Sequence, residues 1–140
     1  RAPGDSRRPV QVARILPSAT TTALDSVDRL ADRATTIIVT AYVRRVEGEG
    51  RVAVPQHVAA WIDRLAQRRK VIVASFGNPY LIRQFPHVGS YLVAYGVSDD
   101  LERATALSLT GRGAITGRVP VSLPGFFQAG DGLVRGNSAR

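Results

Sequence analysis

The 140-residue sequence predicts one α/β domain, built on a mostly parallel, doubly wound sheet with helices on both sides. Three observations favour this class. Short β-branched runs alternate with stretches of helical periodicity. The segments between the runs are long enough for a crossover helix, which parallel strands need. The chain is also long enough to bury a core of its own.

The first half supplies two expected strands and a helix. Val10 to Ile15 is predicted to be a short strand, and Thr35 to Val43, a continuous β-branched run, is predicted to be a strand buried on both faces. A polar, Gly-rich loop from Arg44 to Arg51 follows. The expected helix between the strands places apolar residues on one face, namely Leu24, Val27, Leu30, Ala31 and Ala34.

The second half continues the alternation. A helix is expected from about Pro55, with one apolar face formed by Val58, Trp61, Ile62 and Leu65. The elements expected after it are a buried strand at Lys70–Gly77, a short helix at Asn78–Phe85, a strand at Gly89–Gly96 and a helix at Asp99–Leu109. Asp99 and Glu102 fit a capping box at the start of that last helix. A Gly-rich segment, 111–140, completes a single domain spanning 1–140.

The composition excludes several classes of protein. The chain has no cysteine, so it forms no disulfide and has no thiolate chemistry. No apolar run approaches the roughly 18 residues that span a bilayer, and the N-terminal stretch lacks the apolar core of a signal peptide. We therefore expect no membrane span. The lack of an initiator Met and the polar ends lead us to expect a fragment of a longer protein.

The net charge of +8 raises the question of nucleic-acid binding. The basic residues are scattered, Lys70 is the only lysine, and no stripe or aromatic platform accompanies them. The run Gln67 to Lys70 ends a predicted helix, where cations complement the helix dipole. We interpret the charge as solvated helix and loop surface, and nucleic acid is not the expected partner.

The stretch Val71 to Ile82, VIVASFGNPYLI, ends a buried strand where open α/β sheets usually bind ligands. Asn78 suits a helix N-cap and Pro79 suits the first helical position, so the sequence indicates a helix start. A competing interpretation is a degenerate nucleophile elbow, with Ser75 activated by His57 or His87. That elbow normally needs a glycine two residues before the serine, where this chain has Val73.

Other candidate sites are weaker. The run Gly111 to Arg118 follows a helix and lacks the Gly-Lys-Ser/Thr ending of a phosphate loop. The two histidines lie 30 positions apart without further ligands at metal-binding spacing, so we expect neither metal nor cofactor. The aromatic residues are expected to pack, namely Trp61, Tyr80, Tyr91 and Tyr95.

Two carboxylates in the loop after the second expected strand form the remaining constellation. Glu47 and Glu49 lie in an EGEG run, which is ordinarily a solvated acidic loop. A carboxylate at this position could also protonate a leaving group, as glycosidases require.

Several motifs together resemble the C-terminal domain of glycoside hydrolase family 3, with the β-N-acetylglucosaminidase branch the most similar. The resemblance covers about Thr35 to Leu133, and its most specific part is TGRVPVS, Thr116 to Ser122, followed by SFGNPY. The other matching motifs, in chain order, are IIVTAY, GEGR, VPQHVAAWIDRL, KVIVASFGNPYLI, YLVAYG and LTGRGAITGRVPVSLPG.

The resemblance implies a flavodoxin-like three-layer α/β/α sandwich that follows an N-terminal TIM-like barrel in a hydrolase of β-glucosides or β-N-acetylglucosaminides. The resemblance implies that the nucleophile is an Asp of the barrel. In glucosidases of the family the acid/base is a Glu of the second domain, and Glu47 or Glu49 would occupy that position. In the N-acetylglucosaminidase branch the acid/base is a His of the barrel. Arg51 and Val52 also replace the usual Asp-Arg ending of the loop motif.

By the same resemblance, the SFGNPY turn faces the barrel and shapes the wall of the carbohydrate cleft. The implied cleft residues are Ser75, Gly77, Asn78 and Tyr80. The chain alone is then not expected to be catalytic, and a polymeric sugar substrate favours the cell envelope or exterior for the parent enzyme. The alternative is a stand-alone ligand-binding or interaction module that uses the same crevice without hydrolysis.

Overall fold

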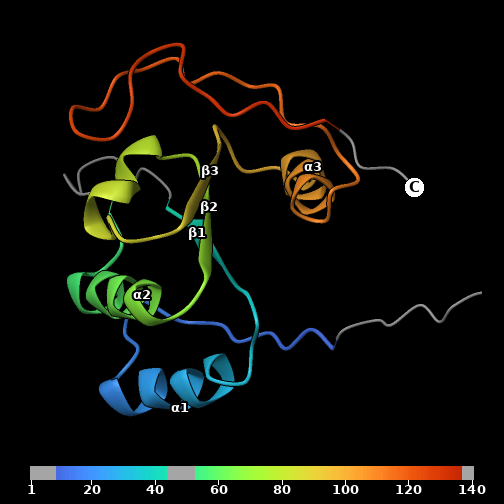
Figure 1. Ribbon diagram of the computed structural model, residues 1–140. Coiled ribbons are helices and arrows are strands. Elements are labelled where there is room, and N and C mark those ends of the chain that lie inside the picture. Colours follow the sequence, from blue (N-terminus) through green and yellow to red (C-terminus); the bar gives the residue numbers. More distant parts are fainter. Residues whose placement is uncertain (1–8, 44–52, 137–140) are drawn as a thin grey trace, which may run out of the picture.

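The computed structural model describes residues 9–43 and 53–136 and confirms the α/β class (Figure 1). The elements in chain order are helix α1 (Thr21–Ala31), strand β1 (Ile37–Tyr42), helix α2 (Gln56–Arg68), strand β2 (Val71–Phe76), the 3₁₀ helix η1 (Pro79–Gln84), strand β3 (Ser90–Ala94) and helix α3 (Asp99–Leu109).

The three strands form one all-parallel sheet in the order β1-β2-β3. Ile37 lies opposite Val71, and Val73 lies opposite Tyr91. Because parallel crossovers are right-handed, an order that advances in one direction carries both connections over the same face. The two connections contain α2 and η1, which lie together on one side of the sheet (Figure 1).

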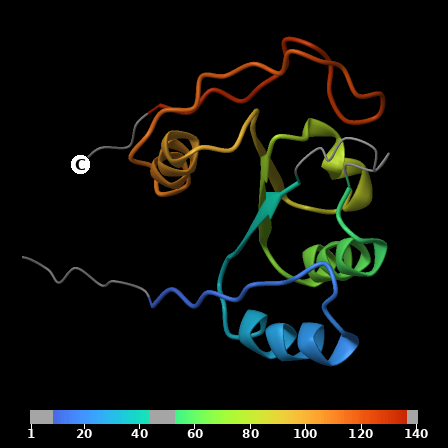
Figure 2. The same cartoon turned by 180° about the vertical axis from the view of Figure 1, so that it is seen from behind.

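The predicted doubly wound, three-layer sandwich is not confirmed. The strand order does not reverse within the described part of the chain. Helix α3 lies on the other side of the sheet from α2 (Figures 1 and 2), but only its Thr105 is buried. The sheet therefore has one well-packed helical layer and a second face that is only partly covered.

The main core lies between the sheet and the helices α1, α2 and η1. In β2, Val71 and Val73 point toward these helices and are at most 1% exposed. The other buried members of this core are Leu24, Ala31, Ala41, Val58, Ala59, Trp61, Ile62, Leu65, Leu81 and Phe85. Trp61 thus packs in the core, as its helical spacing predicts.

The prediction of a strand at Val10 to Ile15 is wrong. These residues belong to no strand, and Val10 and Val12 are 86% and 87% exposed. A β-branched alternation becomes a strand only where a neighbouring strand and a packed face are available. Thr35 to Val43 was expected to be buried on both faces, but β1 is an edge strand whose Ile38 and Tyr42 are about half exposed.

Helix starts follow the sequence closely, with one correction. Asn78 caps η1 through its side chain, which accepts from the backbone N of Tyr80, and Pro79 is at the first turn. Helix α2 begins directly after Pro55. The expected cap of α3 at Asp99 is wrong by one residue, because Ser98 is the N-cap and accepts from the backbone N of Leu101. Asp99 instead adds negative charge to the first turn, which complements the helix dipole.

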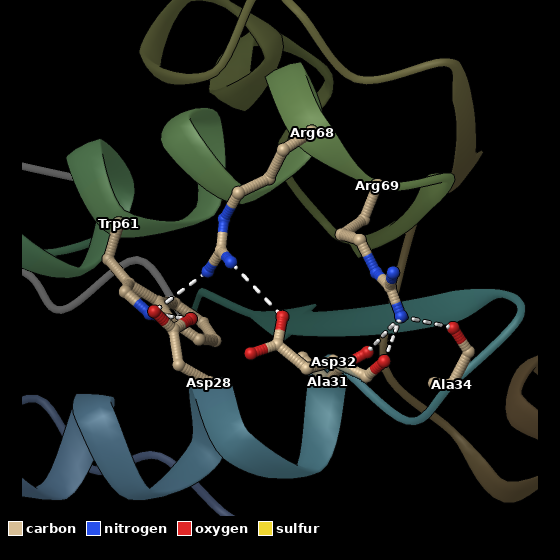
Figure 3. A network of polar contacts seen from close by, with 7 residues as sticks. All are labelled: Asp28, Ala31, Asp32, Ala34, Trp61, Arg68 and Arg69. Carbon is tan, nitrogen blue, oxygen red and sulfur yellow. Dashed lines mark hydrogen bonds and ion pairs between the residues drawn. The ribbon is translucent and has the colours of Figure 1, made fainter.

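Arginines from α2 and its C-cap tie α1 to the sheet (Figure 3). The guanidinium of Arg69 donates through one nitrogen to the backbone oxygens of Ala31, at 2.9 Å, Asp32, and Ala34, at 2.8 Å. It therefore adds charged hydrogen bonds to the carbonyl of the last α1 residue and to two carbonyls just after the helix. Part of the positive charge that we interpreted as solvated surface is structural.

A second arm of the same network joins the two helix surfaces. Arg68 lies 2.8 Å from one oxygen of Asp28 and 3.1 Å from an oxygen of Asp32. The other oxygen of Asp28 accepts a 2.9 Å hydrogen bond from Trp61 Nε1, so the indole is satisfied although its ring is buried.

The segment after α3 turns back on itself as an irregular hairpin. Ile115 and Arg135 exchange backbone hydrogen bonds of 2.9 Å, and Val119 N donates to Asp131 O at 2.8 Å. Leu123 is 1% exposed and anchors the hairpin. A Cβ on Gly132 would lie 2.6 Å from the carbonyl oxygen of Gly117, so this close approach requires glycine.

None of the helices within residues 9–43 and 53–136 combines the length and the apolar character needed to cross a bilayer. This agrees with the expectation from the sequence.

The Arg69 contacts predict an asymmetry between two adjacent arginines. Arg69→Ala removes a charged donor from partly buried carbonyls and should lower the free energy of unfolding by about 1.5–3 kcal/mol. Arg68→Ala removes ion pairs whose arginine is 45% exposed and should cost less than about 1 kcal/mol. Urea denaturation of both variants compares the two costs. Equal losses, or a larger loss for Arg68→Ala, would contradict this assignment.

Candidate functional site

The carboxyl end of β2 leads into a tight turn that is fixed by its own side chains. Ser75 is fully buried, and its Oγ donates a 2.6 Å hydrogen bond to the carbonyl of Asn78. Gly77 has a φ of +103°, a conformation that favours glycine, and its N donates to Ala94 O at 2.7 Å. The turn is therefore locked to the end of β3.

Tyrosines surround this edge of the sheet. Tyr42 is the last residue of β1, Tyr80 lies in η1 directly after the turn, and Tyr95 follows the last residue of β3. They are 48%, 44% and 48% exposed, respectively. Tyr91 is partly buried within β3, but its hydroxyl donates to the carbonyls of Asn78 and Pro79, both at 3.2 Å. All four tyrosines of the chain thus reach the carboxyl edge of the sheet.

Two neighbours, Phe76 and Glu102, contact the side chain of Tyr42. Its ring stacks on Phe76 of the neighbouring strand, with centroids 4.7 Å apart and planes 2° from parallel. Burial raises the pKa of Tyr42, and the charge of Glu102 and a hydrogen bond to its carboxylate raise it further. Glu102 is in the first turn of α3, so this contact also links α3 to β1.

The raised pKa values of Tyr42, Tyr91 and Tyr95 keep these three phenols protonated at neutral pH. Burial raises the pKa of Tyr95, and the nearby Tyr80 adds to the effect. Burial is also the main reason that the pKa of Tyr91 is raised. These side chains can therefore offer aromatic faces and hydroxyl hydrogen bonds to a ligand, but they are not bases.

The nucleophile-elbow interpretation finds no support in the geometry. Ser75 Oγ is engaged with a backbone carbonyl. His57 Nε2 lies 3.0 Å from Ala19 O, and His87 Nδ1 lies 2.9 Å from an oxygen of Asp63. Neither histidine contacts Ser75, so these residues do not form a nucleophile and base pair.

Four of the sequence-predicted site residues come together at the turn, namely Ser75, Gly77, Asn78 and Tyr80. Ser75 and Asn78 shape the backbone, and Tyr80 exposes its ring. Tyr80 and Tyr95 were expected to pack but are nearly half exposed. Glu47 and Glu49 lie outside the described residues. Within the described ranges, no group of three His, Asp or Glu side chains is arranged to bind a metal.

Sequence reasoning missed Tyr42, Tyr95 and Glu102 as members of this site. Tyr42 and Tyr95 each stand at the end of a parallel strand, and the ends of parallel strands meet at one edge. That position was the available signal. Glu102 gave no such signal, because its contact with Tyr42 depends on where α3 lies relative to the sheet.

Two hollows lie elsewhere, on the helical side of the sheet. One, of about 440 Å³, is lined by Asp28, Trp61, Arg64, Leu65, Gln67 and Arg68. The other, of about 360 Å³, is lined by Gln56, Ala59, Ala60, Asp63 and Gln84. None of these residues belongs to the tyrosine cluster.

Comparison with known proteins identifies no relative. No family model matches the chain, and neither the curated proteins nor the solved structures yield a significant match.

The pair Asp63 and His87 joins α2 to the segment before β3 and predicts a specific dependence of stability on pH. Asp63 is 18% exposed and accepts from the backbone N of His87 at 3.1 Å. Burial alone would raise the pKa of Asp63, but the hydrogen bonds and charge of His87 outweigh it and lower that pKa below its ordinary value of 3.8. Because the folded-state pKa is depressed, this stabilisation is present above the unfolded pKa and is lost as the pH falls through the folded value.

Asp63→Asn should therefore be less stable than the parent at neutral pH. In acid, where the parent loses this stabilisation, the two proteins should become more similar in stability. The difference in unfolding free energy between parent and variant should shrink as the pH falls from about 5 to below about 3. Urea titrations across this range measure it. Asp25→Asn, at an exposed position of α1, serves as the control and should show a smaller change. A difference for Asp63→Asn that is constant with pH would contradict the assignment.

Proposed function

We propose that this chain is the accessory C-terminal domain of a family 3 glycoside hydrolase and that it forms one wall of a cleft for β-linked N-acetylglucosamine or glucose. One observation carries the proposal beyond the motif resemblance. Two exposed tyrosines, Tyr80 and Tyr95, lie near each other at the SFGNPY turn, and the exposed Tyr42 stacks on Phe76 of the same motif. By the resemblance, this is the edge that meets the barrel.

The cluster suits a carbohydrate. A pyranose ring presents C–H groups on its faces and hydroxyls at its rim. A tyrosine offers an apolar ring with a hydroxyl at its tip, so one side chain can pack on a sugar face and hydrogen-bond its rim. The parallel stack of Tyr42 on Phe76 fixes one such ring in advance, which lowers the conformational cost of binding.

The proposal assigns the bond-breaking chemistry to the barrel. Hydrolysis of a glycoside requires two carboxyl groups, or a substitute for one, on either side of the scissile bond. The carboxylates Glu47 and Glu49 are two residues apart in a Gly-flanked loop, so they do not supply such a pair by themselves. The role of this domain is therefore to position the sugar.

A stand-alone ligand-binding module remains the second candidate, and the same observation favours it. The tyrosine cluster would then bind a ligand without any partner domain. The coding sequence upstream distinguishes the two, because only the glycosidase requires a barrel.

Kinetics of the chain joined to its barrel test the proposal. Tyr80→Ala should raise KM for an aryl N-acetyl-β-glucosaminide about tenfold, the equivalent of 1.4 kcal/mol of lost binding, with little change in kcat. Tyr80→Phe keeps the ring and should lie between the parent and the alanine variant. Asp25→Ala, at an exposed position of α1 away from the site, should match the parent. A KM for Tyr80→Ala equal to that of Asp25→Ala would contradict the cleft assignment.

The same assay examines the two glutamates. If the barrel supplies the acid, as the N-acetylglucosaminidase likeness implies, Glu47→Gln and Glu49→Gln should stay within a few-fold of the parent. If the loop supplies it, one variant should lose about 100-fold or more on a poor leaving group. The isolated chain should fold and release no chromophore, and turnover by the chain alone would overturn the accessory role.

A further inference from the structure

Strand β1 has a free edge and a partly open face. It pairs with β2 along one side, and no other described strand pairs with it. On the face opposite α2, Ile38 and Tyr42 are 50% and 48% exposed, and Thr40 between them is also exposed. An edge of this kind presents unpaired backbone donors and acceptors that can pair with an added strand.

The same chain carries a strand-like segment without a sheet, Val10 to Ile15. Val10 and Val12 alternate with Gln11 and Ala13, so they would share a face in an extended strand, and they are 86% and 87% exposed. These two side chains are two residues apart, so they would lie beside Ile38 and Thr40 if the segment lay along β1 with its valines on the open face, because alternate residues of a strand share a face.

The segment does not use the edge of its own sheet. Ile15 packs against the core, and Ala19, four residues later, is fixed by its N–H to Leu16 O and its carbonyl to His57. From there the segment crosses the molecule toward the side of α3 instead of running along β1 (Figures 1 and 2). It therefore leaves the body of its own domain as an extended arm.

We propose that two copies of this chain exchange these arms, so that Val10 to Ile15 of each copy adds as a strand to the free β1 edge of the other. When the segment of the first copy adds to the β1 edge of the second, the segment of the second copy and the β1 edge of the first are still unpaired. A two-fold arrangement pairs these as well and closes the dimer. Main-chain hydrogen bonds supply the affinity of such strand addition, and the alternate side chains supply its register. This proposal is independent of the glycosidase role.

The mass of the full chain in solution tests the exchange. By light scattering, the mass should rise from 15.0 kDa toward twice that value as the concentration increases over about 1 to 100 µM. Val12→Lys should keep the chain monomeric at the top of that range, while circular dichroism shows it folded, because Val12 is 87% exposed in one copy. Leu133→Lys makes the same kind of change at a 90% exposed position of the C-terminal hairpin and should still dimerise.

Cross-linking identifies which edge the segment occupies. Since the chain has no cysteine, Val12→Cys and Thr40→Cys single variants can be mixed and oxidised without background. The proposal predicts a disulfide between the two chains, and less of it when Thr40→Cys is replaced by Ala104→Cys on α3.

Three results would overturn the proposal. The first is a monomer at every concentration. The second is loss of the dimer on Leu133→Lys but not on Val12→Lys. The third is a 12 to 40 disulfide that forms within a double variant and not between the single ones.

Discussion

The burial of β2 on both sides is the constraint on which the rest of the structure depends. Val71, Val73, Ala74, Ser75 and Phe76 are each at most 1% exposed, and β2 pairs with a parallel strand on each side. Its N-terminal end follows Arg69, which binds the end of α1, and its C-terminal end becomes the Ser75 to Asn78 turn. A shift of β2 by one residue would turn its core side chains to the other face and misplace both ends.

The two ends of β2 show how one strand organises both stability and the candidate site. At the first end, a guanidinium donates to the carbonyls of Ala31 and of Ala34 beyond it, so the end of α1 is fixed beside β2 by charged hydrogen bonds as well as by apolar packing. At the second end, a buried hydroxyl and a positive-φ glycine turn the chain sharply, and the rings of Tyr80 and Tyr95 come to the same edge as Tyr42. The proposed cleft wall is thus an outcome of parallel strand register.

Sequence patterns predicted the elements that bury a face and failed where tertiary packing decides. The strands at Ile37–Tyr42, Val71–Phe76 and Ser90–Ala94 and the turn at Asn78 follow from periodicity and capping chemistry. The segment Val10 to Ile15 has a strand-like alternation but no partner strand among the described residues. The exposure of Tyr80 and Tyr95 depends on the edge formed by three strands. The binding of α1 by Arg69 depends on contacts across 30 or more residues. Local sequence patterns encode neither.

Amide hydrogen exchange tests the central position of β2 most directly. Amides that open only with global unfolding exchange slowest. The account predicts that the amides of Val71 to Phe76, with that of Gly77 bonded to Ala94, are the most protected in the chain, that β1 is less protected along its free edge, and that α3 exchanges sooner. Protection of α3 equal to or greater than that of β2 would contradict the claim that β2 holds the structure together.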